Sequence, residues 1–325
     1  QSLTPPGERA PRGSETVDGQ GKYLVPGLWD AHVHLRSSEG GGLDLESFAA
    51  FGITSVRDLG GYPERLDEAL AHSANAPTVY SARDMLNGES FAGFQAVVTT
   101  PRDVAREIER LASEGAAFVK VHRALDPDLL SVVVREAHAR GLKVTGHIPR
   151  GMHPLMACQA GMDGVEHVGS IVEALASVLP DGANSSDDAL RYLLSDATNR
   201  VYNCLSNSGV YVTPTLSVYL AIARHRAGGD DLPPEYLEFV DALKAITKKL
   251  YDAGAPLLAG TDTTDLNENF VLEPGRALHD ELALLESAGI PAAELIQIAS
   301  VNPAQFVSAF DDTGSITPGK AADFV

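Results

Sequence analysis

The stretch PGLWDAHVHL, residues 26–35, reads as an apolar β-strand that carries two histidines at its carboxyl end. Side chains alternate between the two faces of a strand, so His32 and His34 share one face. Two imidazoles on one face can hold a single metal ion, at about 2.0–2.1 Å if the ion is zinc. A lone pair of this kind is more often one packed histidine and one surface histidine. The segments that follow therefore decide between the two interpretations.

Strand-like and helix-like segments alternate along the rest of the chain. Seven further strands are expected at residues 53–56, 77–82, 116–121, 142–147, 163–167, 210–213 and 256–262, with helical segments between most of them and irregular loops at 83–100 and 214–232, the second a loop or lid. Eight βα units predict a parallel sheet closed into a (β/α)8 TIM barrel. A doubly wound open sheet is the alternative. It usually has fewer strands, and no glycine-rich phosphate fingerprint follows the first strand.

The composition of the chain limits the classes of molecule that the protein is expected to bind. The chain has 325 residues and a formal net charge of −19, which argues against binding to nucleic acid or to an anionic membrane surface. No apolar run approaches the roughly 20 residues of a membrane span, and no signal peptide is visible. A small-molecule substrate is the expected partner. Self-association into a homo-oligomer stays open, as does the compartment, cytoplasmic or exported.

The chain has two cysteines, Cys158 and Cys204. Two are too few for a disulfide framework. Each is expected to be a small buried apolar residue, and the pair therefore leaves the redox compartment undecided.

Six potential ligands occur where expected strands end. They are His32, His34, Lys120, His147, His167 and Asp262. Taken singly, such a histidine is as often a hydrogen-bonded core residue, a lysine is usually solvated, and an aspartate after Gly-Thr is often a helix N-cap. Barrel active sites lie at the carboxyl ends of the strands. Six ligand-type residues at that one end predict a shared metal site.

The motifs PGLWDAHVHL, FVKVH, TGHIP, DGVEHV and LLAGTD, with the tail SVNPAQF…GSITPGKAADFV, follow one another along the chain. This set resembles the amidohydrolase superfamily of metal-dependent hydrolases, most closely its imidazolonepropionase-like, prolidase-like and carboxypeptidase-like members. The resemblance covers residues 17–325. It implies a metal site with one ion held by His32, His34 and Asp262 and a second by His147 and His167.

The resemblance further implies that Lys120, carboxylated by CO2, bridges two divalent cations, with zinc the expected metal. A bare ammonium beside two cations would be repelled, whereas a carbamate is an anion with two oxygens to share. The implied reaction is hydrolysis of an amide or peptide-like bond (a carboxamide, dipeptide or N-acyl amino acid) by a metal-bridging hydroxide, with Asp262 as the proton shuttle.

Two alternatives remain at this point. The first is a mononuclear cyclic-amide hydrolase of imidazolonepropionase type, with Lys120 unmodified; that branch does not need the lysine. The second is a barrel that binds small molecules without turnover. Intact candidate ligands argue against the second alternative.

Other polar residues lie near the expected strand ends. His122 follows Lys120 by two residues and is either a pocket residue or a surface histidine. Arg150, with His153, could bind a substrate carboxylate, and Tyr219 could donate a hydrogen bond to a substrate carbonyl.

Two further positions are expected to support the strands. Asp30 shares a strand face with His32 and either supports the metal ligands or is purely structural. Arg57 and Asp58 are expected to form an internal ion pair.

The resemblance also sets the expected domain organisation. Its members carry a small β-sandwich built from residues before the first barrel strand and after the last helix. Here we expect a sandwich remnant at residues 1–20, the barrel at 21–310 and a truncated sandwich segment at 311–325, with most of the sandwich missing. The barrel and its metal site lie elsewhere and are expected to persist.

Overall fold

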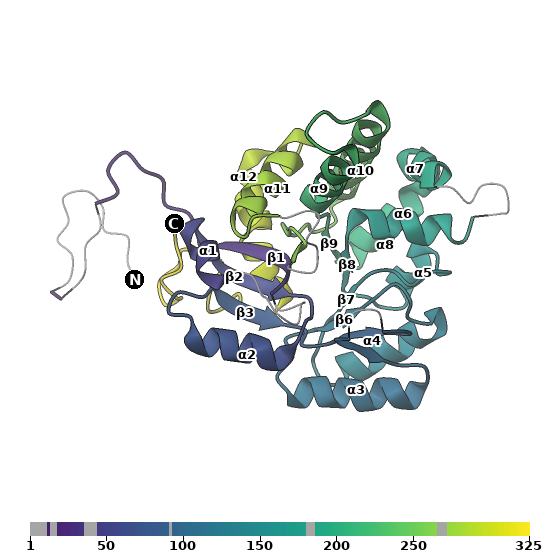
Figure 1. Ribbon diagram of the computed structural model, residues 1–325, viewed down its shortest axis with the longest axis horizontal. Helices are drawn as coiled ribbons and strands as arrows, with labels where there is room; N and C mark the ends of the chain where they lie inside the picture. The colour runs from purple at the N-terminus through teal and green to yellow at the C-terminus, as the bar shows by residue number, and fades with distance from the viewer. Residues whose placement is uncertain (1–11, 14–17, 36–43, 91–92, 180–185, 265–271) are drawn as a thin grey trace.

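The computed structural model describes residues 12–13, 18–35, 44–90, 93–179, 186–264 and 272–325, and it consists of parallel strands surrounded by helices (Figure 1). The first sheet has the order β10-β1-β2-β3, formed by Thr263–Thr264, Leu28–His34, Ile53–Asp58 and Thr78–Ser81. The second has the order β5-β4-β6-β7-β8-β9, formed by Gln95–Val97, Met85–Asn87, Val119–Val121, Val144–Gly146, Gly164–Glu166 and Tyr211–Thr213. Every strand pair is parallel.

Backbone hydrogen bonds join the two sheets at both ends. They run from Ala117 N to Ser81 O (2.9 Å), from Leu258 N to Val212 O (2.9 Å) and from Ala31 N to Ala259 O (2.8 Å). The segment 256–260 therefore lies between β9 and β1 and completes the ring. Gly260 permits this approach, since a Cβ there would lie 2.7 Å from the backbone nitrogen of His32. The predicted (β/α)8 class is confirmed, and the open-sheet alternative is wrong.

Helices cover the outside of the strands. They are α1 Leu45–Ala50, α2 Pro63–His72, α3 Pro101–Ser113, α4 Leu130–His138, α5 Pro154–Gln159, α6 Val168–Ala176, α7 Ser186–Leu194, α8 Asn199–Asn207, α9 Leu216–Ala227, α10 Pro234–Asp252, α11 Arg276–Ser287, α12 Ala292–Ile298 and α13 Val301–Phe306, with 3-10 turns η1 Pro127–Leu129 and η2 Asp196–Thr198. Within the described part of the chain, none of these helices is both long enough and apolar enough to span a membrane.

Helix α3 shows how local sequence sets an element. Thr100 and Asp103 form a reciprocal capping box at its start, and Pro101 occupies the first turn, where its missing N–H costs nothing. Val104, Ile108 and Leu111 recur at helical spacing and are all buried. This apolar stripe is the face that α3 buries against the rest of the fold.

Two segments expected to be irregular are ordered. The stretch 83–100 contains the short strands β4 and β5, and 214–232 contains α9 instead of a loop or lid. Thr215, which precedes α9, makes no side-chain cap. Instead the buried carboxylate of Glu281 on α11 accepts hydrogen bonds from Leu216 N (3.0 Å) and Ser217 N (2.7 Å). The cap comes from a residue more than 60 positions away, so local sequence does not reveal it.

Glu281 is expected to make stability depend on pH. Burial raises its pKa to about 7 from an ordinary value of 4.5. The folded chain therefore keeps this proton to higher pH than the unfolded chain, and the stabilisation is complete below about pH 4.5 and declines as pH rises through about 7. The advantage of wild type over Glu281→Gln in urea denaturation should shrink across that range. A difference independent of pH would contradict the assignment.

The cysteines form a disulfide, so the expectation of two separate buried thiols is wrong. Cys158 on α5 is bonded to Cys204 on α8. The two residues are 46 positions apart, and only the packing of α5 against α8 brings them together. The sequence contains no local signal for this pairing.

Reducing this disulfide is expected to lower the free energy of unfolding by about 2–4 kcal/mol, because the crosslink restricts the unfolded chain over a loop of intermediate length. Urea denaturation with and without dithiothreitol measures the effect. The double variant Cys158→Ser/Cys204→Ser is the control and should not respond to dithiothreitol. Equal stability of oxidised and reduced wild type would contradict the prediction.

The segment that leads into β1 pairs with the end of the chain. Val25 and Val325 exchange two backbone hydrogen bonds (3.0 and 2.9 Å), and Gly27 N donates to Asp323 O (3.0 Å). Most of the expected remnant at residues 1–20 lies outside the described residues. The division into barrel and sandwich segments stays a prediction.

Candidate metal centre

His32, His34 and Asp262 converge at the carboxyl end of β1. The Asp262 Oδ1 atom lies 3.2 Å from His32 Nε2 and 3.4 Å from His34 Nε2. The three side chains form a group that could hold a metal ion, with one donor atom from each within 4.8 Å of the others. His32 is fully buried, whereas the Asp262 side chain is 23% exposed to solvent.

The hydrogen bonds of the two imidazoles fix which nitrogens face Asp262. His32 Nδ1 lies 2.9 Å from a Glu166 oxygen, and His34 Nδ1 lies 2.7 Å from Gly60 O. Both partners are acceptors, so each Nδ1 carries a proton, and each Nε2 presents a lone pair when its ring is neutral. With both imidazoles neutral, three potential ligand atoms meet within 4.8 Å of one another, and His32 Nε2 is fully buried beside Asp262 Oδ1. A divalent cation fits this donor set.

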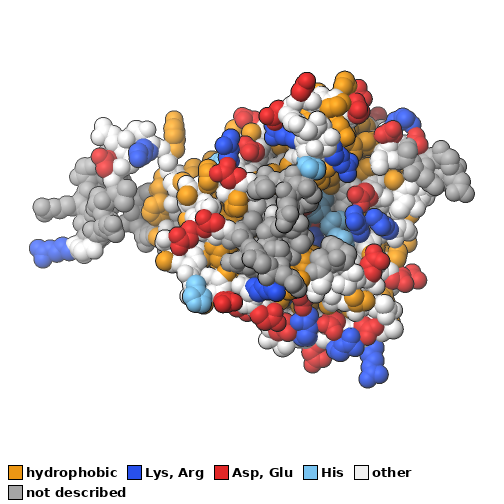
Figure 2. All heavy atoms as spheres, in the orientation of Figure 1, with side chains coloured by type: hydrophobic (Ala, Val, Ile, Leu, Met, Phe, Trp, Pro, Cys, Tyr) orange, Lys and Arg blue, Asp and Glu red, His pale blue; other side chains and the backbone are white. Residues whose placement is uncertain are grey.

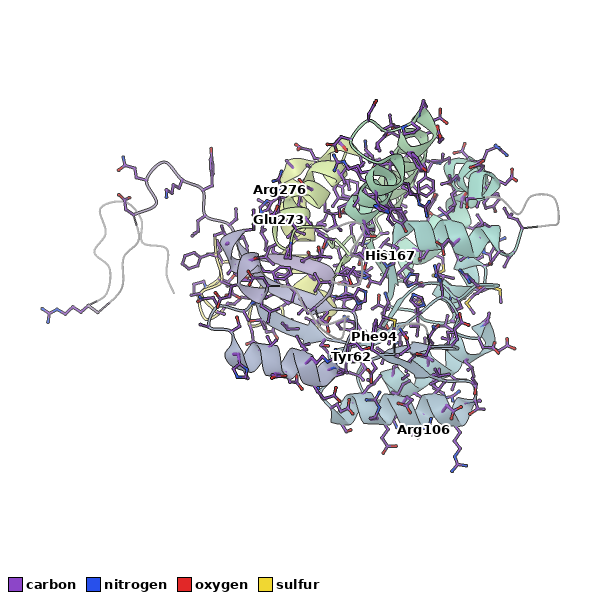
Figure 3. The ribbon with its side chains drawn as sticks, viewed as in Figure 1. Tyr62, Phe94, Arg106, His167, Glu273 and Arg276 are labelled. Carbon is purple, nitrogen blue, oxygen red and sulfur yellow. A yellow bond between two sulfur atoms is a disulfide. The ribbon has the colours of Figure 1, made fainter. Side chains whose placement is uncertain are left out.

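His147, His167 and Lys120 extend the group across the strand ends. The His167 ring lies 4.5 Å from that of His32 and 4.6 Å from that of His147, between centroids. Lys120 on β6 is 1% exposed, and its Nζ atom has no hydrogen-bond partner in the described structure. Figure 3 shows His167 near the centre of the molecule, where the strands meet, whereas Arg106 projects outward from α3.

Burial keeps most of these nitrogens neutral, but the pKa of His32 is raised, because Asp262 and Glu166 outweigh burial and the charge of Lys120. Burial lowers the pKa of His34 to about 4, and burial together with the charge of Lys120 lowers the pKa of His147 well below its ordinary value. Burial also lowers the pKa of Lys120 to about 8. Burial alone would raise the pKa of Asp262, but His167 and His32 outweigh it and hold that pKa below its usual range. Neutral imidazoles and an ionised carboxylate are the states that ligate a metal, so an ion that binds here would displace any proton from His32 Nε2.

Glu166 is a supporting residue that the sequence interpretation missed. Its carboxylate, fully buried, accepts from Arg57 Nη2 (2.6 Å), Thr145 Oγ1 (2.5 Å) and His32 Nδ1 (2.9 Å). The guanidinium of Arg57 also lies over the Phe306 ring, 4.2 Å from its centroid. Glu166 stands directly before His167 in the DGVEHV motif. The sequence did contain a signal for this role, because Glu166 is a charged residue within an expected buried strand.

The predicted ion pair between Arg57 and Asp58 is wrong. Arg57 pairs with Glu166, while Asp58 accepts from Ser81 Oγ (2.7 Å) and Leu35 N (3.1 Å). Neighbouring residues on a strand point to opposite faces, so two adjacent side chains do not meet.

Asp30 supports the backbone beside the ligands. Its buried carboxylate accepts from His32 N (3.3 Å), Thr261 N (3.1 Å) and Thr261 Oγ1 (2.7 Å). It thereby ties β1 to the residue that precedes Asp262. Burial raises its pKa to about 7. Between the two interpretations of Asp30, the contacts favour support of the ligand-bearing segments.

The candidate substrate contacts differ in position. His122 is buried, and its ring lies 4.4 Å from that of His147. Tyr219 lies on α9 and packs against Phe239, with its hydroxyl close to Gly169. Arg150 is exposed and lines a cavity beyond β7. Only His122 contacts a predicted metal ligand in the described contacts.

Comparisons with known proteins agree with this geometry. An uncharacterized protein of Mycobacterium tuberculosis is 24% identical over 88% of this chain and 75% of its own length. The ochratoxinase of Aspergillus niger is 24% identical over 93% of this chain and 69% of its own, and its crystal structure superposes with a TM-score of 0.69, at 22% identity over 93% and 76% of the two chains.

A crystal structure of a prolidase complexed with N-methylphosphonate-L-proline superposes with a TM-score of 0.73, at 20% identity, over 98% of this chain and 83% of that one. The model of the amidohydrolase family matches residues 23–325. The chain belongs to the amidohydrolase family and is a hydrolase that acts on carbon–nitrogen bonds.

Proposed function

We propose that this protein is a binuclear metal-dependent hydrolase that cleaves an amide or peptide-like bond in a carboxamide, dipeptide or N-acyl amino acid. The observation that carries the proposal is the convergence of His32, His34 and Asp262, whose potential ligand atoms lie within 4.8 Å of one another. The names of the relatives support the bond type, since they include a prolidase and an ochratoxinase.

Six residues would hold two divalent ions, with zinc as the expected metal. His32, His34 and Asp262 would ligate one, and His147 and His167 the other. Lys120 would bridge them as a carbamate: its neutral Nζ forms a bond to the carbon of CO2, and the displaced amine proton passes to solvent. The lowered pKa of Lys120, about 8, makes the neutral amine accessible near neutral pH. When bound, the ions would lower the pKa of water to roughly 7 and polarise the scissile carbonyl.

The protein's own residues would manage the proton. Asp262 is ionised at neutral pH, and its side chain is partly exposed to solvent. Its carboxylate can therefore accept a proton from the attacking water. The same oxygen can then deliver that proton to the leaving amine nitrogen. Glu166 holds His32 in one tautomer throughout, because it accepts the Nδ1 proton.

Hydrolysis of a panel tests the proposal. Zinc-loaded protein is assayed against N-acyl amino acids, dipeptides, carboxamides and lactones, and turnover of at least one amide is the expected result. Absence of turnover throughout the panel would favour a barrel that only binds small molecules. Lys120→Ala should lose activity; an unaffected variant would favour the mononuclear cyclic-amide hydrolase.

A further inference from the structure

We propose that Arg123 and Arg150 form an anion-binding subsite beside the carboxyl ends of β6 and β7. The preferred substrate would then carry a free carboxylate that is not part of the scissile bond. This inference rests on the proposed function and names its substrate class: N-acyl amino acids and dipeptides over neutral amides.

A cavity of about 340 Å³ lies beside the ends of β6 and β7. This volume lies within the range of small-molecule sites, about 300–1,000 Å³. Arg123, Asp126 and Arg150 are among its lining residues. Both guanidinium-bearing residues thus line one cavity although they follow different strands.

The backbone around the cavity is held in place. Arg150 N donates to Arg123 O (2.9 Å), which fixes the two arginine-bearing segments against each other. Leu125 N donates to His122 O (3.0 Å), and Ala124 N donates to Asn87 Oδ1 (3.0 Å). The turn that carries Arg123 is therefore preorganised, which lowers the entropic cost of binding a ligand there.

The only acid paired with either guanidinium group in the described structure is Glu173, which forms a long ion pair with Arg123. Arg123 Nη1 lies 4.0 Å from Glu173 Oε2, too far for a hydrogen bond, and both side chains are about half exposed. No described carboxylate lies within 4.0 Å of a nitrogen of Arg150. Asp126, which also lines the cavity, accepts from Asp128 N (3.0 Å) at the start of η1. Guanidinium groups bind carboxylates through paired hydrogen bonds, so these two offer the donors that such a ligand needs.

The subsite adjoins the candidate metal centre. Arg123 follows His122, and the His122 ring lies 4.4 Å from that of His147. In Figure 2 histidine side chains are visible at the middle of the face, with basic side chains beside them. An anion bound here would sit beside the reacting bond and not on it.

Steady-state kinetics test the subsite on matched substrates. The N-acyl amino acid that zinc-loaded wild type hydrolyses best is compared with its C-terminal amide. In Arg123→Gln/Arg150→Gln, KM for the carboxylate form should rise about 10- to 100-fold, as expected for the loss of charge-assisted hydrogen bonds, whereas kcat/KM for the amide should stay within about twofold. Arg191→Gln, on the exposed face of α7, is the control for the charge change.

Binding is tested separately by NMR of arginine Nε–Hε signals in metal-free protein. N-acetyl-L-alanine should shift two arginine signals that are missing from the double variant, and N-acetyl-L-alanine amide should not. Unchanged signals, or equal KM changes for both substrate forms, would overturn the subsite while leaving the proposed hydrolase intact. Turnover of neither form would count against the hydrolase, and the NMR result would still decide the subsite.

Discussion

Replacing Glu166 by alanine is expected to lower the free energy of unfolding by about 3–5 kcal/mol, because the substitution leaves a buried charge without its partner. Arg57 Nη2 lies 2.6 Å from Glu166 Oε1, and neither side chain is exposed. Thr145 would also lose its acceptor. Urea denaturation of metal-free protein measures this loss without any contribution from a bound ion.

The same substitution should weaken zinc binding. Without Glu166, the Nδ1–H group of His32 has no acceptor to orient the ring. Loss of such a supporting carboxylate typically lowers metal affinity by about 10- to 100-fold. Glu136→Ala, on the surface of α4, is the matched control and should change neither quantity. A Glu166→Ala protein as stable as wild type would show that the buried network does not hold the strands together.

The second large effect is expected for Asp262→Asn. The amide preserves the size of the side chain but cannot take up a proton, so kcat should fall by about 10²- to 10⁴-fold, as for loss of a general acid–base. Because Asp262 is also a candidate ligand, zinc content is measured on each preparation and kcat is expressed per metal-loaded molecule.

The control for this substitution is Asp241→Asn, at an exposed position on α10 that pairs only with Lys244 in the described contacts. It should retain wild-type kcat and zinc content. Wild-type kcat in fully loaded Asp262→Asn would exclude Asp262 as the proton shuttle. Loss of zinc without loss of kcat per loaded molecule would restrict its role to ligation.

The features that sequence predicted are those with a local cause. Strand β1 is apolar and ends on two histidines, and residues 26–35 contain both features. Parallel strands all present their carboxyl ends to one side of a barrel. That topology brings together His32 and Asp262, which are 230 positions apart, and it could be inferred once the strands were recognised.

The features that sequence missed depend on contacts between distant segments. Arg57 meets Glu166 across 109 positions, Cys158 meets Cys204 across 46, and Glu281 caps a helix that has no cap of its own. Each pairing follows from the packing of whole elements, which single-chain periodicity does not encode.

Metal content measured alongside activity tests the binuclear centre most directly. Wild type reconstituted with zinc and CO2 should contain two zinc ions per chain at full activity, and Lys120→Ala, which lacks the bridging group, should contain no more than one and be inactive. A wild-type enzyme that reaches full activity with a single zinc ion, together with an active Lys120→Ala variant, would contradict it.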